Sequence, residues 1–463
     1  MERTLIKNLK ENVGKEVRLD GWVDVRRDHG KLIFIDLRDA SGKIQTVFSP
    51  SHKNAHAKAS LARAEWVLEV TGMVNERPEK MVNKDEPNGD IELEVTGISV
   101  LNESETPIFD VTTDGREVNE EIRLKYRYLD LRRKRLSHNL RQRHSITKFI
   151  RDFLSERDFV EVETPILTKS TPEGARDYIV PSRVERGKFY ALPQSPQQYK
   201  QLLMAGGLER YFQIAKCMRD EDTRGDRQPE FTQLDMEMSF VTQEDVMKIN
   251  EELLIALIEK MYPEKRIQKK PFPRITYKEA IEKYGTDRPD LREDKDDQNL
   301  LAFSWVVDFP FFEKSDGGGW TFTHNPFSAP KPEHMGQLMS EKNISEILTT
   351  QYDVVLNGLE IGGGSIRNHK PEALLKVLQI IGYPKETAEK NFGHMLEAFR
   401  FGTPPHGGIA WGLDRFISLM LNEPNIREVI AFPKTGEGRD LMMNAPSEID
   451  EKQLKELGIK IVR

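Results

Sequence analysis

The sequence predicts an α+β protein of more than one domain, and two observations lead to this class. The first is an N-terminal run of alternating strands, from residue 17 to residue 100, that contains a single helical segment. The second is a longer C-terminal region, from residue 137 onward, in which strand patterns and amphipathic helix patterns are interspersed. At 463 residues the chain is long enough for two or three domains, each with its own core.

The bulk composition excludes several classes of protein. No apolar run approaches the roughly 18 residues that a bilayer-spanning helix needs, so no membrane partner is expected. The N-terminus lacks the apolar core of a signal peptide, which predicts a cytoplasmic protein. Cys217 is the only cysteine, which excludes an internal disulfide, and its apolar neighbours predict a buried thiol. Because the net charge is −7, any nucleic-acid binding must come from local basic surfaces.

The N-terminal region has the strand order of an OB-fold barrel. Five strands are predicted, with a helix between the third and the fourth, and this order is common in platforms for single-stranded nucleic acids. The strands are expected at residues 17–25, 31–37, 43–48, 65–74 and 90–100, and the helix at residues 51–64.

Phe34 is the candidate for a base-stacking contact in this barrel. In the second strand the aliphatic residues at 33, 35 and 37 face one way, so Phe34 faces the other. An exposed aromatic ring beside Arg26, Arg27 and Gln45 is what stacking next to phosphates requires. The strand pattern is equally compatible with a Phe34 side chain packed beneath a loop.

A connector and a basic segment follow the barrel. Asn102–Asn119 contains Pro and Asp, and Arg123–His144 is dense in Arg and Lys. Such a charge run is usually a solvated helix face, but its place between a nucleic-acid platform and a second domain also fits contact with an RNA backbone. We therefore expect an OB-fold domain at 1–104, a linker at 105–136 and a second domain at 137–463.

The second domain opens with an amphipathic helix over Leu140–Arg157. The strand pattern after it runs into Pro165, which marks a sheet edge or an interface. Thr171–Gly174 is a turn-rich loop that carries a carboxylate. A further helix begins near Ser195, with that residue or its neighbour as N-cap. This helix carries three polar side chains, Gln197, Gln198 and Lys200.

The stretch from Arg219 to Phe240 is the most unusual part of the chain. Alternating residues on both sides of a loop with Gly225 predict two antiparallel strands. A folded chain places many charges on a sheet only if they are satisfied, and here a ligand is the candidate. One face of the second strand would carry Phe231, Gln233, Asp235 and Glu237.

Two glycine-rich segments lie near the C-terminus. Three successive glycines follow Glu360 within a strand pattern, which indicates close approach of a ligand or a sharp bend, while a plain β-turn fits as well. The segment GLDRFISLMLN predicts a helix with an apolar stripe that includes Leu413. Arg415 lies off this stripe near the helix N-terminus, a place suited to a phosphate tail.

These segments resemble, in order, the three signature motifs of the class II aminoacyl-tRNA synthetases. FVEVETPIL is similar to motif 1, CMRDED with RQPEFTQLDME to motif 2, and GLDRF to motif 3. The segments TPEGARDY, PQSPQQYKQLLM, THNPFSAP, GGGSIR and FGTPPHGGIAWGLDR resemble aspartyl-tRNA synthetases of the bacterial type. The match covers nearly the whole chain, including the OB domain, which binds the anticodon in this family.

The resemblance implies a two-step reaction. Aspartate and ATP would form aspartyl-AMP, and the aspartyl group would then pass to the terminal ribose of tRNA. Such a reaction needs positioning and charge stabilisation at the α-phosphate, and no protein nucleophile. The residues with an implied catalytic role are Arg219, Glu360 and Arg415.

The resemblance also implies an ATP site with Mg²⁺ as cofactor. Arg219 would bridge the α-phosphate and the α-carboxylate, and Arg415 would meet the γ-phosphate. Asp353 and Glu360 would be the metal ligands, because hard oxygen donors suit Mg²⁺. The implied ATP-binding residues are Arg219, Asp220, Glu221, Gln228, Glu360, Gly412, Leu413, Asp414 and Arg415.

Aspartate and tRNA contacts are implied in the same way. Arg367 and Lys200 match the positions that hold the side-chain carboxylate. The implied aspartate-binding residues are Glu173, Ser195, Gln197, Lys200, Arg219, Gln233, Asp235, His324 and Arg367. The implied anticodon contacts are Arg26, His29, Phe34, Gln45 and Glu92. The implied partners are tRNA(Asp), ATP, L-aspartate and a second copy of the chain in a homodimer.

The chain departs from the family pattern in three places. The family usually carries a large insertion domain between motifs 2 and 3, and the sequence leaves no room for one near residues 290–300. Asn325 stands where a second histidine is common, which puts the role of that histidine in doubt. His29 occupies a place associated with relaxed anticodon discrimination, so the resemblance implies tRNA(Asn) as an additional acceptor.

Two alternatives share much of this pattern. An asparaginyl- or lysyl-tRNA synthetase has the same motifs and OB domain, but Lys200 and Arg367, two cations for one side chain, favour a carboxylate substrate. A non-catalytic tRNA-binding paralogue would be expected to lack Arg219, Glu360 or Arg415, and the sequence retains all three.

Overall fold

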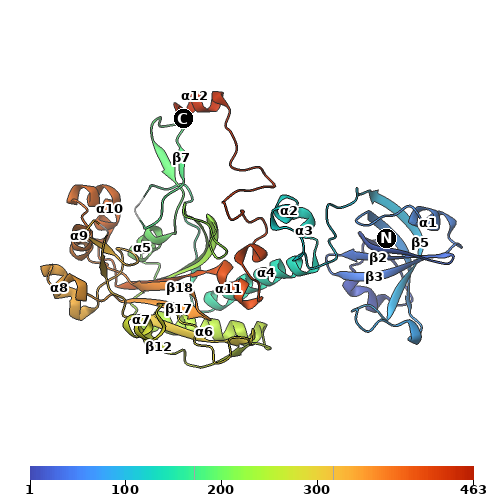
Figure 1. Cartoon of the computed structure of the whole chain (residues 1–463), viewed down its shortest axis with the longest axis horizontal. Coiled ribbons are helices and arrows are strands. Elements are labelled where there is room, and N and C mark those ends of the chain that lie inside the picture. Colours follow the sequence, from blue (N-terminus) through green and yellow to red (C-terminus); the bar gives the residue numbers. More distant parts are fainter. Residues whose placement is uncertain (171–172, 316, 463) are drawn as a thin grey trace. The chain divides into compact units, whose positions relative to one another are not determined.

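The computed structural model describes residues 1–170, 173–315 and 317–462. Thr171 and Pro172, which open the predicted turn-rich loop, lie outside the described residues. The chain divides into two compact units, Met1–Asn119 with Tyr128–Lys134, and Glu120–Arg127 with Arg135–Arg463 (Figure 1).

The first unit contains a closed five-stranded barrel, as the strand order predicts. Its strands follow the order β1-β2-β3-β5-β4, in which β3 and β5 run parallel and the other neighbours are antiparallel. Alternate side chains point inward, so that Leu19, Ile35 and Leu93 are completely buried. The elements are η1 (Ile6–Asn12), β1 (Glu16–His29), β2 (Leu32–Asp39), β3 (Gly42–Phe48), α1 (Lys53–Ala59), β4 (Val67–Glu76), η2 (Glu79–Met81) and β5 (Ile91–Asn102).

The helix between the third and fourth strands is shorter than predicted. The sequence pattern predicts a helix over residues 51–64, whereas α1 ends at Ala59. The chain then turns to bury Ala62 and to place Glu65, with a φ of 69°, beneath Arg38. The two terminal nitrogens of Arg38, Nη1 and Nη2, each lie 2.6 Å from an oxygen of the Glu65 carboxylate. This buried ion pair requires a turn where local propensity alone favours helix.

The second unit is built on an eight-stranded sheet with the order β12-β14-β17-β18-β19-β10-β9-β6. The six central strands are antiparallel, and the two edge strands pair parallel with their neighbours. The strands are β6 (Val160–Glu161), β9 (Arg210–Met218), β10 (Glu230–Ser239), β12 (Arg274–Thr276), β14 (Phe303–Val307), β17 (Gln351–Leu356), β18 (Leu359–Ile366) and β19 (His406–Gly412).

Helices and small two-stranded sheets make up most of the other regular structure from residue 120 onward. The helices from residue 120 onward are α2 (Glu120–Lys125), α3 (Arg127–Asp130), α4 (Lys134–Ser155), α5 (Gln197–Ala205), α6 (Gln243–Met261), α7 (Tyr277–Tyr284), α8 (Met335–Ser340), α9 (Pro371–Ile380), α10 (Lys385–Phe399), α11 (Leu413–Met420) and α12 (Glu451–Leu457). The short strands are β7 (Ile179–Pro181), β8 (Phe189–Ala191), β11 (Arg266–Ile267), β13 (Leu300–Leu301), β15 (Phe312–Lys314) and β16 (Trp320–Phe322). Three-residue and four-residue 3₁₀ turns are η3 (Pro332–His334), η4 (Ile344–Glu346) and η5 (Ile426–Val429).

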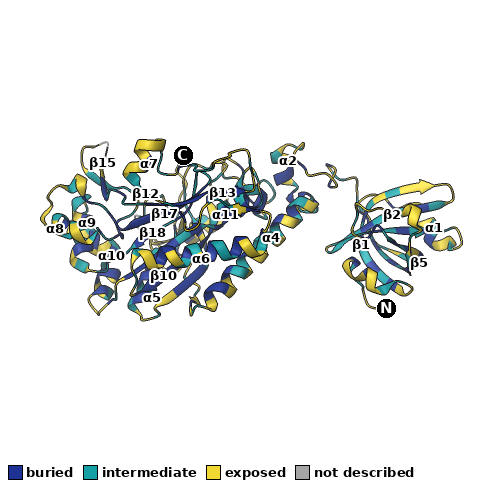
Figure 2. Ribbon diagram, turned by 90° about the horizontal axis from the view of Figure 1, so that it is seen from below, coloured by how far each residue is buried: buried dark blue, intermediate teal, exposed yellow. Residues whose placement is uncertain are grey.

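One face of the large sheet forms the main hydrophobic core. Helices α4, α6 and α11 pack on it, and Figure 2 shows the buried strands beside these amphipathic helices. Strand β10 illustrates the division of faces, because Leu234, Met236 and Met238 belong to this core. Their neighbours at 233, 235 and 237 must then face the other side of the sheet. No helix among the described residues is long and apolar enough to cross a membrane.

Two antiparallel strands flank the Gly225 loop as predicted, but the first strand ends at Met218, so residues 219–224 belong to the loop and not to a strand. Strands β9 and β10 are antiparallel and are joined by the loop from Arg219 to Pro229. Cys217 on β9 is completely buried, as its apolar neighbours predict, and burial raises the pKa of its thiol to about 12. This strand pair is central to the sheet, which makes it a rigid support for the polar side chains of β10.

Three arginines of the basic segment Arg123–His144 lie neither on a solvated helix face nor on an RNA-binding surface. Arg123, Arg127 and Arg133 are buried, and each guanidinium is bound within the protein. The expected solvated face is therefore wrong for these arginines, and an RNA contact through them is excluded as well. Arg123 pairs with Glu428, and Arg127 donates to backbone carbonyl groups of the C-terminal segment, partners that local sequence reasoning does not include. Arg133 instead pairs with the nearby Asp130.

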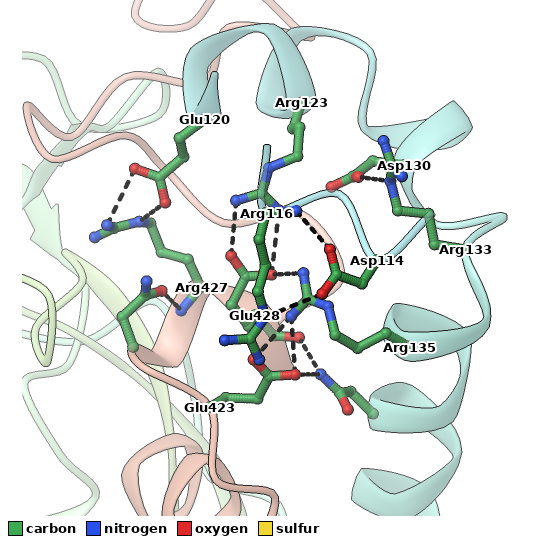
Figure 3. A network of polar contacts seen from close by, with 12 residues as sticks. Asp114, Arg116, Glu120, Arg123, Asp130, Arg133, Arg135, Glu423, Arg427 and Glu428 are labelled. Carbon is green, nitrogen blue, oxygen red and sulfur yellow. Dashed lines mark hydrogen bonds and ion pairs between the residues drawn. The ribbon is translucent and has the colours of Figure 1, made fainter. Parts of the chain in front are cut away.

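A network of ion pairs and hydrogen bonds joins α2 and α4 to the segment around η5 (Figure 3). Arg123 donates to both oxygens of Glu428, at 3.2 and 2.9 Å. Arg135 donates to Glu428 at 2.9 Å and to Glu423 at 2.8 Å. These arginines outweigh the effect of burial and lower the pKa of Glu428 to about 2.

The glycine run lies in the middle of strand β18, so the plain-turn interpretation is wrong. The turn is instead at Asn357 and Gly358, between β17 and β18. A Cβ on Gly364 would lie only 2.0 Å from the carbonyl oxygen of Gly408 on the neighbouring strand β19. The close approach that the sequence predicts is therefore, at this position, an approach of protein backbone.

Candidate active site

A polar cavity of about 590 Å³ lies on the sheet face opposite the core. Strands β10, β17, β18 and β19 form its floor, and α5, α11 and three loops form its walls. Most residues that the resemblance implies come together there. They are Glu173, Ser195, Gln197, Lys200, Arg219, Glu221, Gln228, Gln233, Asp235, His324, Asp353, Glu360, Arg367, Gly412, Asp414 and Arg415.

A β-bulge brings Glu360 and Arg367 to the same cavity. They are seven residues apart, so a regular strand would point them to opposite faces. The register of β18 against β17 shifts between Val354 and Val355, which adds one residue on the β18 side. This bulge restores a common face for the two side chains.

Two buried cations that line the cavity pair with two buried carboxylates. Lys200 Nζ lies 2.6 Å from Asp235 Oδ1 and 3.3 Å from Glu237 Oε2. Arg367 donates to both oxygens of Glu237, at 2.9 and 3.1 Å. Burial alone would raise the pKa of Glu237, but Arg367 and Lys200 hold it below its usual value. Burial prevails at Asp235 and raises its pKa despite Lys200.

The resemblance does not include Glu237 among the site residues. Its side chain is completely buried, and its carboxylate accepts two hydrogen bonds from one edge of the Arg367 guanidinium. The signal that identifies it is the period-2 pattern, because Glu237 shares a face of β10 with Asp235. A buried carboxylate next to a cavity with two cations is a positioning group for those cations.

Several buried polar atoms around the cavity have no hydrogen-bond partner among the described residues. A buried polar atom normally has a partner, so such atoms indicate where a ligand binds. Those in cavity residues are Asp235 Oδ2, Arg219 Nε, Gln228 Nε2 and Arg415 Nε.

The guanidinium groups of Arg219 and Arg415 have contacts within the protein, but the buried Nε of each has no hydrogen-bond partner among the described residues. Arg219 lies over the ring of Phe231, with 5.1 Å between Cζ and the ring centroid. Arg415 donates to the carbonyl oxygen of Glu360, and its Nη2 lies 3.2 Å from Asp226. The pair with Asp226 connects α11 to the loop between β9 and β10.

Three residues of the implied ATP set lie differently from the others. Leu413 is completely buried in the core. Asp414 reaches the cavity wall, but its carboxylate accepts from the backbone N–H of Thr232 at 2.8 Å and from Arg143. Asp220 is not among the cavity residues, and its carboxylate lies 3.7 Å from Arg176. For all three, side-chain contact with a ligand in this cavity has less support than for Glu221 or Gln228.

Asp353 and Glu360 meet above a glycine, which suits a divalent cation. A Cβ on Gly363 would lie 2.6 Å from Asp353 Oδ1 and 3.5 Å from Glu360 Oε1, so its absence leaves a cradle between the two carboxylates. Burial and the nearby Glu360 raise the pKa of Asp353 well above its usual value. Among the described residues no group of three or more metal-binding side chains occurs, so phosphate or water oxygens would have to complete the coordination.

The Glu173 loop is tied to the start of helix α5. Ser195 Oγ donates to Glu173 at 3.3 Å, and Gln198 Nε2 donates to the other oxygen at 3.2 Å. The N-cap is Pro196, the neighbour of Ser195, as one of the two predicted alternatives has it, but it makes no side-chain capping bond. The hydroxyl of Ser195 is used for the loop instead.

His324 and Asn325 have separate roles on the opposite wall. His324 Nε2 lies 3.8 Å from Asp353 Oδ2, and burial lowers the pKa of the imidazole. Asn325 Oδ1 accepts from the backbone N–H groups of Phe327 and Ser328, at 2.9 and 3.1 Å. An asparagine at this position therefore closes a turn, which explains how the chain accommodates the departure from histidine.

The implied anticodon residues of the barrel divide between two faces. Phe34 pairs across the strands with Arg27, so both face outward, and Arg27 also donates to Gln45. Gln45 in turn donates to Glu92 at 3.1 Å. Arg26 instead pairs with Ile35, whose side chain is in the core, and so faces away from Phe34. Arg27, which the implied set omits, has the better position beside the ring. His29 is the exposed last residue of β1.

Comparisons with known proteins agree with this geometry. The profile of the family described as "tRNA synthetases class II (D, K and N)" matches residues 119–436, and that of the "OB-fold nucleic acid binding domain" matches residues 17–101. Two solved structures share the fold. They are an asparaginyl-tRNA synthetase from Pyrococcus horikoshii (TM-score 0.75, 24% identity, covering 94% of this chain and 98% of that one) and a putative aspartyl-tRNA synthetase from Leishmania major Friedlin (0.73, 22%, 93% and 93%).

Curated relatives match over nearly the full length. An "Aspartate–tRNA(Asp/Asn) ligase" from Rubrobacter xylanophilus is 42% identical, covering 97% of this chain and 95% of the relative. An "Aspartate–tRNA ligase" from Staphylococcus aureus is 40% identical, covering 97% of each. The first alignment spans 574 positions, at least 111 more than the 463 residues of this chain, so the relative contains segments that this chain lacks. The chain belongs to the class II tRNA synthetases of the aspartate, lysine and asparagine group.

Proposed function

We propose that this chain is an aspartate–tRNA ligase, which activates L-aspartate with ATP and transfers the aspartyl group to the 3′ end of tRNA(Asp). One observation supports this substrate above all, the pair of buried cations Lys200 and Arg367 that line the cavity. Both cations also pair with buried carboxylates, which hold them in place. A dicarboxylic amino acid would add the negative charge that two cations can share.

Asparagine and lysine fit this pocket less well. A neutral amide would forgo a charge-assisted bond to Arg367, and an ammonium group would face two cations at close range. Sites that bind a charged group discriminate strongly against neutral analogues, because their own charges would be left unpaired. The carboxylates of Asp235 and Glu173, beside Gln197, have the charge and the place to bind the α-ammonium group.

The chemistry needs orientation more than covalent help. Attack of the aspartate α-carboxylate on the α-phosphate releases diphosphate, and Arg219, with an unpartnered buried Nε, can stabilise the charge that develops. Arg415 would hold the far end of the triphosphate. Attack of the tRNA ribose hydroxyl on the mixed anhydride then releases AMP.

Asp353 and Glu360 are the residues that would hold Mg²⁺. A bound Mg²⁺ would neutralise phosphate charge and help to fix the triphosphate. The cradle above Gly363 gives both carboxylates access to one ion. Glu360 can serve two purposes there, because its carbonyl oxygen also accepts a bond from Arg415.

Amino-acid-dependent ATP–diphosphate exchange tests the proposed activation step. The purified chain with Mg²⁺ should exchange label with L-aspartate and give background rates with L-asparagine and L-lysine. Exchange that depends on asparagine or lysine would replace the proposal with one of the sister activities. No exchange with any of the three, in a chain that still binds tRNA, would favour a non-catalytic paralogue.

Charging of tRNA(Asn) in addition to tRNA(Asp) is the second part of the proposal. His29 at the exposed end of β1, beside the outward face with Phe34, is the residue that motivates it. The printed name of the Rubrobacter relative, which includes both tRNAs, supports the same extension. Aminoacylation of each purified tRNA with labelled aspartate tests it, and a rate with tRNA(Asn) no higher than without tRNA would refute it.

We further propose a cytoplasmic homodimer, since the reaction needs tRNA and ATP and since strand β6 borders an apolar surface. Val160 in β6 and Ile166 and Leu167 in the segment after it are 46%, 40% and 53% exposed. Exposed aliphatic side chains of this kind are typical of a protein interface. Sedimentation should give a dimer at micromolar concentration, and a monomer would contradict this assignment.

A further inference from the structure

A chain of hydrogen bonds runs from the cavity into the protein interior and ends on a backbone carbonyl. Gln197 Nε2 donates to Gln201 Oε1 at 2.9 Å. Gln201 Nε2 lies 3.1 Å from His406 Nε2, and His406 Nδ1 lies 2.8 Å from the carbonyl oxygen of Pro404. Gln201 and His406 are completely buried, whereas Gln197 lines the cavity. The four groups are called the Gln197–Pro404 chain below.

The direction of every bond in this chain follows from its inner end. The carbonyl oxygen of Pro404 can only accept, so His406 Nδ1 must carry a proton. In a neutral imidazole the other nitrogen, Nε2, is then an acceptor, and Gln201 must present its NH₂ group to it. The oxygen of Gln201 therefore faces outward and accepts from the NH₂ group of Gln197.

The outer end of the Gln197–Pro404 chain is therefore a hydrogen-bond acceptor. Once the NH₂ group of Gln197 is used toward Gln201, its Oε1 remains, and no donor among the described residues binds it. Glu173 and Asp235, two carboxylates of the implied aspartate-binding set, line the same cavity. An amide oxygen beside two carboxylates is a site for a positively charged donor.

We infer that Gln201 and His406 are positioning residues that hold the Gln197 amide with its oxygen toward the α-ammonium group of the substrate. This inference rests on the proposed function, since it assigns an orientation to a residue of the proposed aspartate site. Without the chain, the Gln197 amide can rotate by 180° and present NH₂ to the ammonium group, which repels it. Gln201 and His406 act through Gln197 and touch no substrate themselves.

The neutral state of His406 is part of the argument. A second proton would make Nε2 a donor, reverse Gln201 and Gln197, and turn an NH₂ group toward the substrate. Burial lowers the pKa of His406, although the nearby Glu237 opposes this effect, and Arg367 and His369 act in the same direction as burial. The geometry alone, through Pro404, already requires the proton on Nδ1.

A comparison of two ligands tests the inference. L-Aspartate carries the α-ammonium group, and succinate has the same two carboxylates without it. The KM for aspartate and the inhibition constant of succinate are measured by ATP–diphosphate exchange. We expect Gln201→Met to raise the KM for aspartate about 10- to 100-fold, because a hydrogen bond to a charged group is lost, with little change in kcat and in succinate inhibition. A merely structural defect would weaken both ligands.

Three further variants and one control sharpen the test. Gln201→Glu should restore aspartate binding, because a carboxylate accepts from Gln197 and from a doubly protonated His406. Adding Gln201→Met to Gln197→Met should cost nothing more, because the amide to be oriented is already gone. His406→Asn keeps a donor for Pro404 but frees Gln201, so it should reproduce the selective loss if Gln201→Met does not fold. Gln213→Met, at a buried glutamine outside the cavity, is the control for the loss of a buried amide.

The outcomes separate this inference from the proposed function. Wild-type exchange with aspartate, together with an unchanged ratio of aspartate KM to succinate inhibition in Gln201→Met and His406→Asn, would overturn the inference and leave the proposed function standing. Additive losses in the double variant would also overturn it. A wild-type protein without aspartate-dependent exchange would refute the proposed function itself.

Discussion

Replacing Arg367 by leucine separates the contribution of the buried ion pairs to stability from their contribution to substrate binding. The guanidinium makes two hydrogen bonds to Glu237, at 2.9 and 3.1 Å, and both side chains are almost fully buried. Removal of one partner of such a pair costs about 3–5 kcal/mol of folding free energy. We expect the lower end of this range, because Lys200 remains 3.3 Å from Glu237.

Arg367→Leu should reduce the free energy of transition-state binding in aspartate activation by at least as much as it reduces the folding free energy. Arg367→Leu removes the proposed partner of the aspartate side chain, and loss of such a buried charged contact corresponds to about 3 to 4 kcal/mol, or about 150- to 900-fold in kcat/KM for aspartate. The double variant Arg367→Leu with Glu237→Leu removes the whole pair. It should recover most of the stability and none of the activity.

Two measurements on the same protein check this reasoning. Urea unfolding gives the stability, and ATP–diphosphate exchange gives kcat/KM for aspartate. Arg400→Leu, at an exposed arginine, is the matched control and should change neither quantity. The reasoning would be refuted by a single variant that keeps exchange within tenfold of wild type, or by a double variant that regains exchange.

Three further predictions concern acid stability, the anticodon and ATP. Because the pKa of Glu428 is lowered to about 2 from 4.5, its stabilisation, roughly 3 kcal/mol, should be present above pH 4.5 and disappear as the pH falls toward 2; Glu428→Gln should show a flatter loss over that window in unfolding experiments. Phe34→Ala should weaken tRNA binding by about 1–3 kcal/mol, or about 5- to 150-fold in a filter-binding assay, and an equal effect on aspartate-dependent exchange would contradict a role limited to the anticodon. Asp226→Asn should lower the KM for ATP by about two- to fivefold, since Asp226 competes with phosphate for Arg415, whereas Asp222→Asn in the same loop should not.

Local patterns were sufficient for the elements whose partners are close in sequence. The barrel strands, the strand pair β9–β10 and the helix with Arg415 follow from period-2 and period-3.6 alternation. The cavity residues are not given by local patterns but are implied by the resemblance to the family, and the fold brings most of them together.

Long-range partners explain what the patterns could not provide. The local sequence around Arg123 and Arg135 predicts solvated side chains. Their ion-pair partners, Glu428 and Glu423, lie about 300 positions later in the chain. The bulge that brings Glu360 and Arg367 together has no strong local signal, since it depends on the register against β17. The role of His406 likewise depends on a carbonyl and a helix that only the fold brings near it.

The order of the eight-stranded sheet has a consequence for solubility. An open sheet ends in two strands with unpaired backbone groups, and long edges of this kind recruit strands from other molecules. Here the edge strands are β6 and β12, of only two and three residues, while the long and most apolar strands lie inside. Few backbone N–H and C=O groups are thus available for unwanted pairing. Lengthening either edge strand by design would therefore be expected to promote fibrillar aggregation before it disturbed the cavity.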